Sequence, residues 1–240
     1  MKINHTLATA YFILCILGGS AQLVWSEEAP ADPWEAVVRK NDSATVLRFA
    51  RENPDGIKWH DEAGNTVLHC VVASPEIVAA LLPLKPDIEA RNVAGYRPLH
   101  FAVRSGKIGS IESLLAVGAN VKARVAIDAM GEKTGETIMI EIAWVKEPEA
   151  VNAIASLLYA KDPSQLNAHG DLGFTPLMYA VDRGNLVFAK WLLAKGADKN
   201  AKNDSGETAL ESAKSRLAEN KKLGSEPSAD DVTIIDLLSK

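Results

Sequence analysis

The stretch Gly173-Phe174-Thr175-Pro176-Leu177-Met178-Tyr179-Ala180 decides the fold, because its pattern recurs along the chain. The glycine permits a turn with positive φ, the threonine caps a helix, and the proline occupies the first helical turn, where its missing N–H costs nothing. Leucine and alanine, three residues apart, then lie on one face of that helix. The stretch therefore predicts a turn that leads into a short amphipathic helix.

Four further segments repeat the pattern in register. They begin at Gly64, Gly95, Gly135 and Gly206, and with Gly173 in its place the five glycines are 31, 40, 38 and 33 residues apart. A second apolar stretch follows each of them and ends in a leucine pair, at Leu81-Leu82, Leu114-Leu115, Leu157-Leu158, Leu192-Leu193 and Leu237-Leu238. Each unit thus predicts two helices. Because one helix pair cannot bury its own apolar face, the units are expected to stack.

This pattern resembles the ankyrin-repeat family, whose signature is Thr-Pro-Leu-His-x-Ala in a unit of about 33 residues. The segments Arg97-Pro98-Leu99-His100-Phe101-Ala102 and 175–180 carry the resemblance, which extends over about residues 32–240. It implies an all-α ankyrin-repeat solenoid of stacked helix-turn-helix repeats with β-hairpin fingers, about five repeats plus an N-terminal cap. We expect a capping helix pair at 32–60, repeats one to four at 61–205, and a degenerate C-terminal repeat or cap at 206–240.

The first residues have the pattern of an export signal. Lys2 precedes the apolar run 7–17, and Gly19-Ser20-Ala21 offers a cleavage site, so we expect a signal peptide at 1–21, with cleavage after Ser26 as the alternative. The run is too short to span a membrane, which takes about 20 residues. We expect the mature chain in a bacterial periplasm, or alternatively outside the cell, without membrane attachment. Cleavage leaves Cys70 as the last cysteine, which excludes an internal disulfide.

Two regions depart from the repeat. Seven extra residues at 125–131 fall in a turn between repeats, where they predict a lengthened hairpin that is either a binding loop or a neutral insertion. The third repeat has Ile138-Met139-Ile140 in place of Pro-Leu-His. It also has about three additional residues around 144–148 and two near Asp162-Pro163, which we interpret as neutral changes in exposed loops.

In the ankyrin-repeat family, partners dock on the finger tips and on the first helices, which together form the concave face. The matching positions in this chain predict the binding residues Tyr96, Arg104, Ile127, Met130, Trp144, Asp171, Leu172, Phe174, Asp182 and Arg183. Aromatic groups on such a surface are of the type that dominates interface energies. The alternative is that Tyr96, Trp144 and Phe174 fold back against the adjacent repeat.

Charge and motif content argue against catalysis and against nucleic acid as a partner. The formal net charge is −5, which would repel a phosphate backbone and suits a basic protein instead. We find no metal-ligand spacing, phosphate loop or nucleophile elbow, and expect no cofactor or metal. The family resemblance gives His69 and His100 a structural role. A hydrolase or redox enzyme that uses Cys70 and His69 is the disfavoured alternative, because adjacent helical residues point about 100° apart.

The sequence therefore predicts an exported, monomeric, non-enzymatic module that binds another protein through its concave face and finger loops. Small periplasmic ankyrin proteins that this chain resembles imply two roles. The first is an immunity or inhibitor protein that occupies a toxin. The alternative is an accessory or chaperone-like factor that supports an oxidative-stress enzyme such as catalase.

Overall fold

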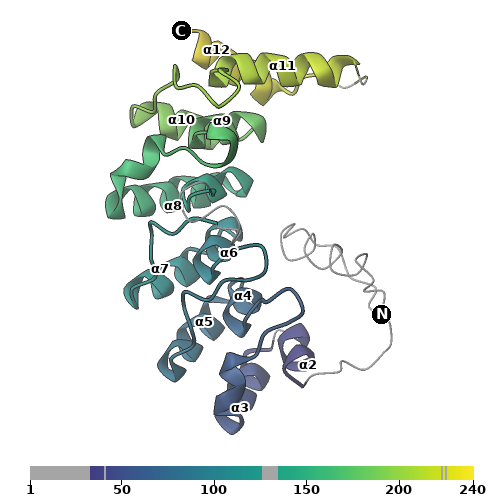
Figure 1. The fold of residues 1–240 in the computed structure, drawn as a ribbon, viewed down its shortest axis with the longest axis vertical. Coiled ribbons are helices and arrows are strands. Elements are labelled where there is room, and N and C mark those ends of the chain that lie inside the picture. The colour runs from purple at the N-terminus through teal and green to yellow at the C-terminus, as the bar shows by residue number, and fades with distance from the viewer. Residues whose placement is uncertain (1–32, 41, 126–134, 223, 225) are drawn as a thin grey trace. The chain divides into compact units, whose positions relative to one another are not determined.

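The structure, a computed structural model, describes residues 33–40, 42–125, 135–222, 224 and 226–240 (Figure 1). The predicted signal peptide at 1–21 and the predicted binding residues Ile127 and Met130 lie outside the described residues. Within them the chain is helical, and two isolated bridges, His60 to Thr66 and Arg124 to Thr137, stand where hairpin fingers were expected. None of the described helices is both long and apolar enough to cross a membrane.

The described residues form two compact units, one ending at Asn120 and one beginning at Val121. The first unit holds three helix pairs, which are α2 (Pro33–Lys40) with α3 (Ser43–Glu52), α4 (Val67–Val71) with α5 (Pro75–Leu81), and α6 (Pro98–Arg104) with α7 (Ile108–Ala116). Two 3₁₀ turns, η1 (Pro54–Lys58) and η2 (Leu82–Leu84), join the pairs. First helices pack on first helices, α2 on α4 and α4 on α6, and second helices pack on second helices, α3 on α5 and α5 on α7.

The second unit repeats this arrangement. Its pairs are the 3₁₀ helix η3 (Ile140–Trp144) with α8 (Pro148–Lys161), α9 (Pro176–Asp182) with α10 (Leu186–Ala194), and α11 (Ala209–Lys222) with α12 (Ala229–Ser239). The connecting 3₁₀ turns are η4 (Pro163–Asn167) and η5 (Asp171–Gly173). Helices α8, α10 and α12 follow one another as second helices, while η3, α9 and α11 pack in sequence as first helices.

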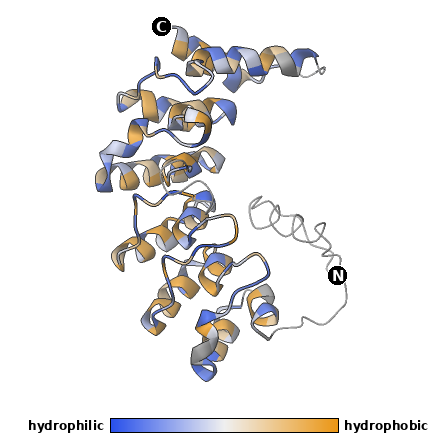
Figure 2. Cartoon of the chain, viewed as in Figure 1, coloured by the Kyte–Doolittle hydropathy of each residue, from blue (hydrophilic) through white to orange (hydrophobic). Residues whose placement is uncertain are grey.

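Apolar burial explains why these short helices form. Each helix carries both hydrophobic and hydrophilic residues (Figure 2), and the hydrophobic ones face neighbouring helices. In α6, Leu99, Ala102 and Val103 are at most 1% exposed, and in α7 Ile111 and Leu114 are fully buried. Isolated helices of five to ten residues are unstable in water. Tertiary packing therefore supplies most of the stability of each pair.

Buried polar side chains tie adjacent repeats of the first unit together. The Asn92 side-chain amide donates to Asn65 Oδ1 over 2.8 Å, and the Ser110 hydroxyl donates to the Val72 carbonyl over 2.6 Å. His69 Nε2 lies 3.0 Å from the Tyr96 carbonyl, while its Nδ1 accepts the Thr66 N–H over 3.1 Å. These bonds satisfy polar groups that burial would otherwise leave costly, and so they fix the register of one repeat on the next.

The third repeat is irregular, as its sequence indicated. Its first helix is the 3₁₀ helix η3, with hydrogen bonds from Ile140 to Thr137 and from Ile142 to Met139 over three residues instead of four. The segment lacks a proline-led first turn, and its β-branched isoleucines are fully buried. Buried Gln165 compensates, because its side chain accepts the Met139 N–H and donates to the Val121 carbonyl.

The expected insertion around 144–148 is wrong in its location. The same eleven-residue interval separates Thr137 from Pro148 and Thr175 from Leu186, so the loop between the helices has the ordinary length. The extra residues lengthen the second helix instead, since α8 has 14 residues and α10 has nine. A helix can absorb three to four residues as one added turn without disturbing its buried face.

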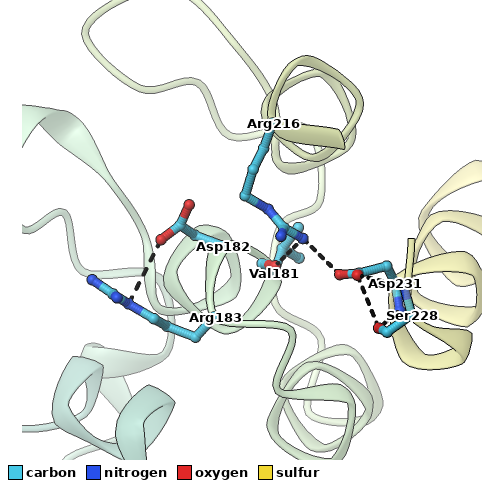
Figure 3. A network of polar contacts seen from close by, with 6 residues as sticks. All are labelled: Val181, Asp182, Arg183, Arg216, Ser228 and Asp231. Carbon is cyan, nitrogen blue, oxygen red and sulfur yellow. Dashed lines mark hydrogen bonds and ion pairs between the residues drawn. The ribbon is translucent and has the colours of Figure 1, made fainter. Parts of the chain in front are cut away.

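An arginine joins the two C-terminal helices to each other by an ion pair and to α9 by a hydrogen bond (Figure 3). Arg216 of α11 donates through Nη2 to Asp231 of α12 over 2.7 Å and to the Val181 carbonyl over 3.3 Å. Ser228 caps α12 by accepting the Asp231 N–H, and its hydroxyl donates back to the carboxylate over 2.8 Å. Partial burial opposes charge on Asp231, but the bonds from Arg216 and Ser228 prevail and hold the pKa of this carboxyl below its usual range.

Candidate protein-binding surface

Two of the predicted binding residues meet in the first unit. Tyr96, just before α6, packs its ring edge-on against Phe101 and His100, with ring centres 5.8 Å apart in both cases. The Arg104 guanidinium lies 5.1 Å from the centre of the Tyr96 ring, and its Nη2 donates to the Tyr96 hydroxyl over 3.4 Å. Tyr96 is thus half-buried and held against its own helix, with a cation over its ring.

Four side chains form a continuous row in the second unit, which we call the aromatic row: Phe174, Tyr179, Trp144 and Arg183. Ring centres are 5.5 Å apart between Phe174 and Tyr179, and 5.7 Å apart between Tyr179 and Trp144. The Arg183 guanidinium lies 4.7 Å from the centre of the Trp144 ring. Trp144 ends η3, whereas Tyr179 lies in α9, with Phe174 just before that helix and Arg183 just after it. The row therefore brings together residues from two successive repeats. Three of its four members were predicted from the sequence.

Tyr179 is the member that sequence reasoning missed. It stands four residues after Thr175, and Phe101 stands four residues after Arg97. Aromatic residues therefore recur at this position in the two repeats whose first helix begins with proline. Burial, followed by the negative charge of Glu136 and a hydrogen bond to it, raises the pKa of the Tyr179 hydroxyl. The hydroxyl therefore stays protonated and donates to the carboxylate, which anchors the middle of the aromatic row.

The finger at 170–173 differs from its counterparts. In two other fingers an asparagine side chain organises the turn: Asn92 accepts the N–H groups of Ala94 and Tyr96, and three repeats further on Asn203 accepts those of Ser205 and Glu207. Gly170 stands at that position here, and the turn becomes η5 instead. Leu172 then adopts φ 54° and leaves its side chain 74% exposed. An apolar, β-carbon-bearing residue in the left-handed region is uncommon and costs conformational energy.

Surrounding hydrogen bonds hold this finger in place. The Leu172 carbonyl accepts the Asp204 N–H of the next finger over 3.0 Å, and Gly170 donates to the Phe174 carbonyl over 2.7 Å. Arg124 supports the residue directly before the finger by donating to the His169 carbonyl over 2.6 Å. Asp171 is exposed beside Leu172. The finger is thus a fixed support that displays one apolar and one acidic side chain.

Asp182 and Arg183 end α9 as an exposed pair, with Arg183 Nε 3.6 Å from Asp182 Oδ2 (Figure 3). Their side chains are 40% and 47% exposed, and such pairs contribute about 0–1 kcal/mol to stability. Beside them a hollow of about 420 Å³ opens between the end of η3 and the α9–α10 turn. Trp144, Lys146 and Arg183 line it, so the aromatic row ends in a recess.

The histidine and cysteine of the disfavoured enzymatic alternative are engaged structurally. Both ring nitrogens of His69 meet backbone groups, and burial lowers its pKa to about 4. An imidazole committed in this way is poorly placed to activate the Cys70 thiol. In the described ranges, no group of three or more histidine, cysteine or acidic residues could hold a metal ion.

Comparison with known proteins identifies the family. A model of three ankyrin-repeat copies matches residues 34–125, and a model of many-copy ankyrin repeats matches residues 157–213. The chain belongs to the ankyrin-repeat family, and the predicted all-α repeat architecture is confirmed. Members of this family bind other proteins through their repeats, so the chain is a protein-binding module.

Two curated relatives are B-cell lymphoma 3 proteins of mammals. The B-cell lymphoma 3 protein homolog of Mus musculus is 33% identical over 223 residues, which cover 89% of this chain and 47% of that protein. The human B-cell lymphoma 3 protein is 33% identical over 162 residues, covering 65% of this chain and 33% of its own length. The chain thus spans about half, or less, of the length of these curated relatives.

A solved structure is similar over nearly its whole length. It comes from the complex of the predatory endopeptidase Bd0816 of Bdellovibrio bacteriovorus with immunity protein Bd3460. The TM-score is 0.66 at 28% sequence identity, and the match covers 88% of this chain and 98% of the solved one.

Proposed function

We propose that this chain is an exported, monomeric inhibitor of the immunity-protein kind, which binds a partner peptidase and blocks it. The observation that carries the proposal is the likeness to a chain of the endopeptidase–immunity protein complex, because that match extends over 98% of the solved chain. The helix-pair fold identifies the neighbour as the immunity protein. The signal-like residues 1–21 support export to the periplasm, where such a partner would act.

The contact surface of the proposed inhibitor combines the finger at 170–173 with the aromatic row. Leu172 projects from a braced turn, Phe174 stands two residues after it, and Trp144 of the preceding repeat completes the surface. Rigid aromatic and apolar groups lose little conformational entropy on binding, and they dominate the energy of most interfaces. The acidic chain, with a formal net charge of −5, supports association with a basic partner.

The decisive experiment is a titration of enzyme activity. The purified protein would be used to isolate its partner from an envelope extract of the source bacterium, and the isolated partner would then be prepared separately. We expect the partner's hydrolytic activity to fall to zero as the protein approaches one equivalent. If the activity is unchanged or rises, and the partner is an oxidative-stress enzyme, then the accessory role replaces the inhibitor role.

Replacing Leu172 with alanine is expected to weaken the complex about tenfold or more, because a central apolar anchor contributes about 2 kcal/mol or more to an interface. The fold should be unaffected, since the side chain is 74% exposed. The measurement is the dissociation constant by calorimetry. Val232→Ala is the matched control, because Val232 is 59% exposed on the second helix α12 and should bind like the parent. If both variants bind with equal affinity, the finger does not contribute to the interface.

A further inference from the structure

The hollow at the end of the aromatic row has walls from three elements. The end of η3 supplies Trp144 and Lys146, the α9–α10 turn supplies Arg183 and Leu186, and the first turn of α12 supplies Asp230. Its volume of about 420 Å³ falls within the range of small-ligand and side-chain sites. All of these residues belong to the second unit, so the hollow is formed within one compact body.

A half-buried amide fixes the shape of the hollow. The Asn185 side chain donates to the carbonyls of Val145 over 2.9 Å, Ala143 over 3.3 Å and Ile142 over 3.4 Å. Its Oδ1 accepts the Phe188 N–H over 3.0 Å and so caps α10. One side chain thereby joins both turns that form the walls, and a ligand would find the site already organised.

Two cations face the hollow without an anion at their terminal nitrogens. Arg183 lies over the Trp144 ring and reaches Asp182 through Nε, so among the described residues its two Nη groups have no acceptor. Its side chain extends away from the Arg216–Asp231 pair (Figure 3). Lys146 is exposed and has no ion-pair partner in the part of the chain that the structure describes. Among the described residues Asp230 is the one acidic residue that lines the hollow, so the described lining carries a net positive charge in an acidic chain.

We propose that this hollow binds the carboxylate of an aspartate or glutamate side chain on an extended segment of the protein partner. The planar fork of an arginine matches a carboxylate with two parallel hydrogen bonds, and stacking on Trp144 holds that fork in orientation. Lys146 adds a second positive charge. The apolar walls Pro148, Leu186 and Val187 receive the neighbouring side chain of the segment. Asp230 and the net charge of −5 disfavour polyanions such as nucleic acid.

The inference rests on the proposed role as a protein-binding module, but its test does not require the natural partner. The probe is a random library of eight-residue peptides displayed on phage, selected on the full chain. We expect selected peptides to contain an aspartate or glutamate next to an apolar residue. Their affinity should fall about tenfold or more for the Lys146→Gln/Arg183→Gln variant, and equally when the peptide acid is replaced by its amide, because a charge-assisted bond is lost in each case.

Matched controls separate the outcomes. Lys190→Gln removes an exposed lysine of α10 that does not line the hollow, and it should leave peptide affinity unchanged. Each selected peptide would be tested both with a free and with an amidated C-terminus. Selection of peptides without acids, binding that depends on a free C-terminus, or affinity unaffected by Lys146→Gln/Arg183→Gln would each overturn the inference. If that variant still inhibits the natural partner fully, the inference fails while the inhibitor role stands.

Discussion

Lowering the pH from 7 to 5 is expected to reduce the unfolding free energy of the unit that ends at Asn120 by about 4 kcal/mol. Burial lowers the pKa of His69 from 6.5 to about 4. It lowers the pKa of His100 to about 3, with Arg97 and Arg104 adding to the effect. At pH values between these folded-state pKa values and the ordinary value of 6.5, the unfolded chain binds protons that the folded chain does not. Stability therefore falls as the pH falls, by about 2 kcal/mol for each imidazole at pH 5.

Urea unfolding at several pH values would measure this effect. The His69→Asn variant retains an acceptor near the Thr66 N–H but cannot titrate, so it should lose about half of the pH dependence while being less stable at pH 7. His60→Asn is the matched control, because His60 is exposed and should change neither quantity by much. A parent protein with equal stability at pH 7 and pH 5 would contradict the assignment of two neutral, buried histidines.

Replacing Asn185 with alanine is expected to destabilise the second unit by about 3 kcal/mol. The variant loses the cap on α10, which contributes about 0.5–2 kcal/mol, and leaves the three carbonyls at the end of η3 without their shared donor. Unsatisfied buried acceptors cost about 1–3 kcal/mol. Chemical denaturation would give the total effect. Hydrogen exchange at Phe188 and Val145 would show that the loss is centred on the two turns.

Asn200→Ala provides the comparison for that variant. Asn200 is exposed in the loop before the last finger, and surface changes of this kind usually stay within about 0.5 kcal/mol. If both alanine variants are equally stable, then Asn185 does not join the turns in solution. The hollow would in that case lack the rigid wall on which carboxylate binding depends, and Asn185→Ala should leave peptide affinity unaffected.

Much of the fold could be predicted because the repeat pattern is local. Gly173, Thr175 and Pro176 determine a turn, a cap and a first helical turn through backbone preferences that act within a few residues. The spacing of apolar residues then defines the buried face of each helix. The third repeat was recognisably irregular for the same reason. The bond by which Gln165 accepts the Met139 N–H of its 3₁₀ helix was not predictable, because 26 residues separate the two.

The candidate site was predicted in part. Family register selected Phe174, Trp144 and Arg183 as surface residues, and the structure places all three in the aromatic row. Register could not show that Arg183 lies on Trp144, since 39 residues separate them. Tyr179 was missed because the family pattern treats its position as variable. The division into two compact units at 120–121 also has no signal in the repeat spacing.

The sequence by itself determined the family, the helix pairs and the positions at which side chains are displayed, because these follow from short-range preferences repeated in register. Tertiary structure alone decided which displayed groups touch. The stacking of η3 against α9 joins Trp144 to Tyr179 and Arg183, and Asn185 reaches back across that same contact to close the hollow. Such pairings depend on the packing of successive repeats, and a periodic sequence specifies the order of its units but not the side chains that meet between them.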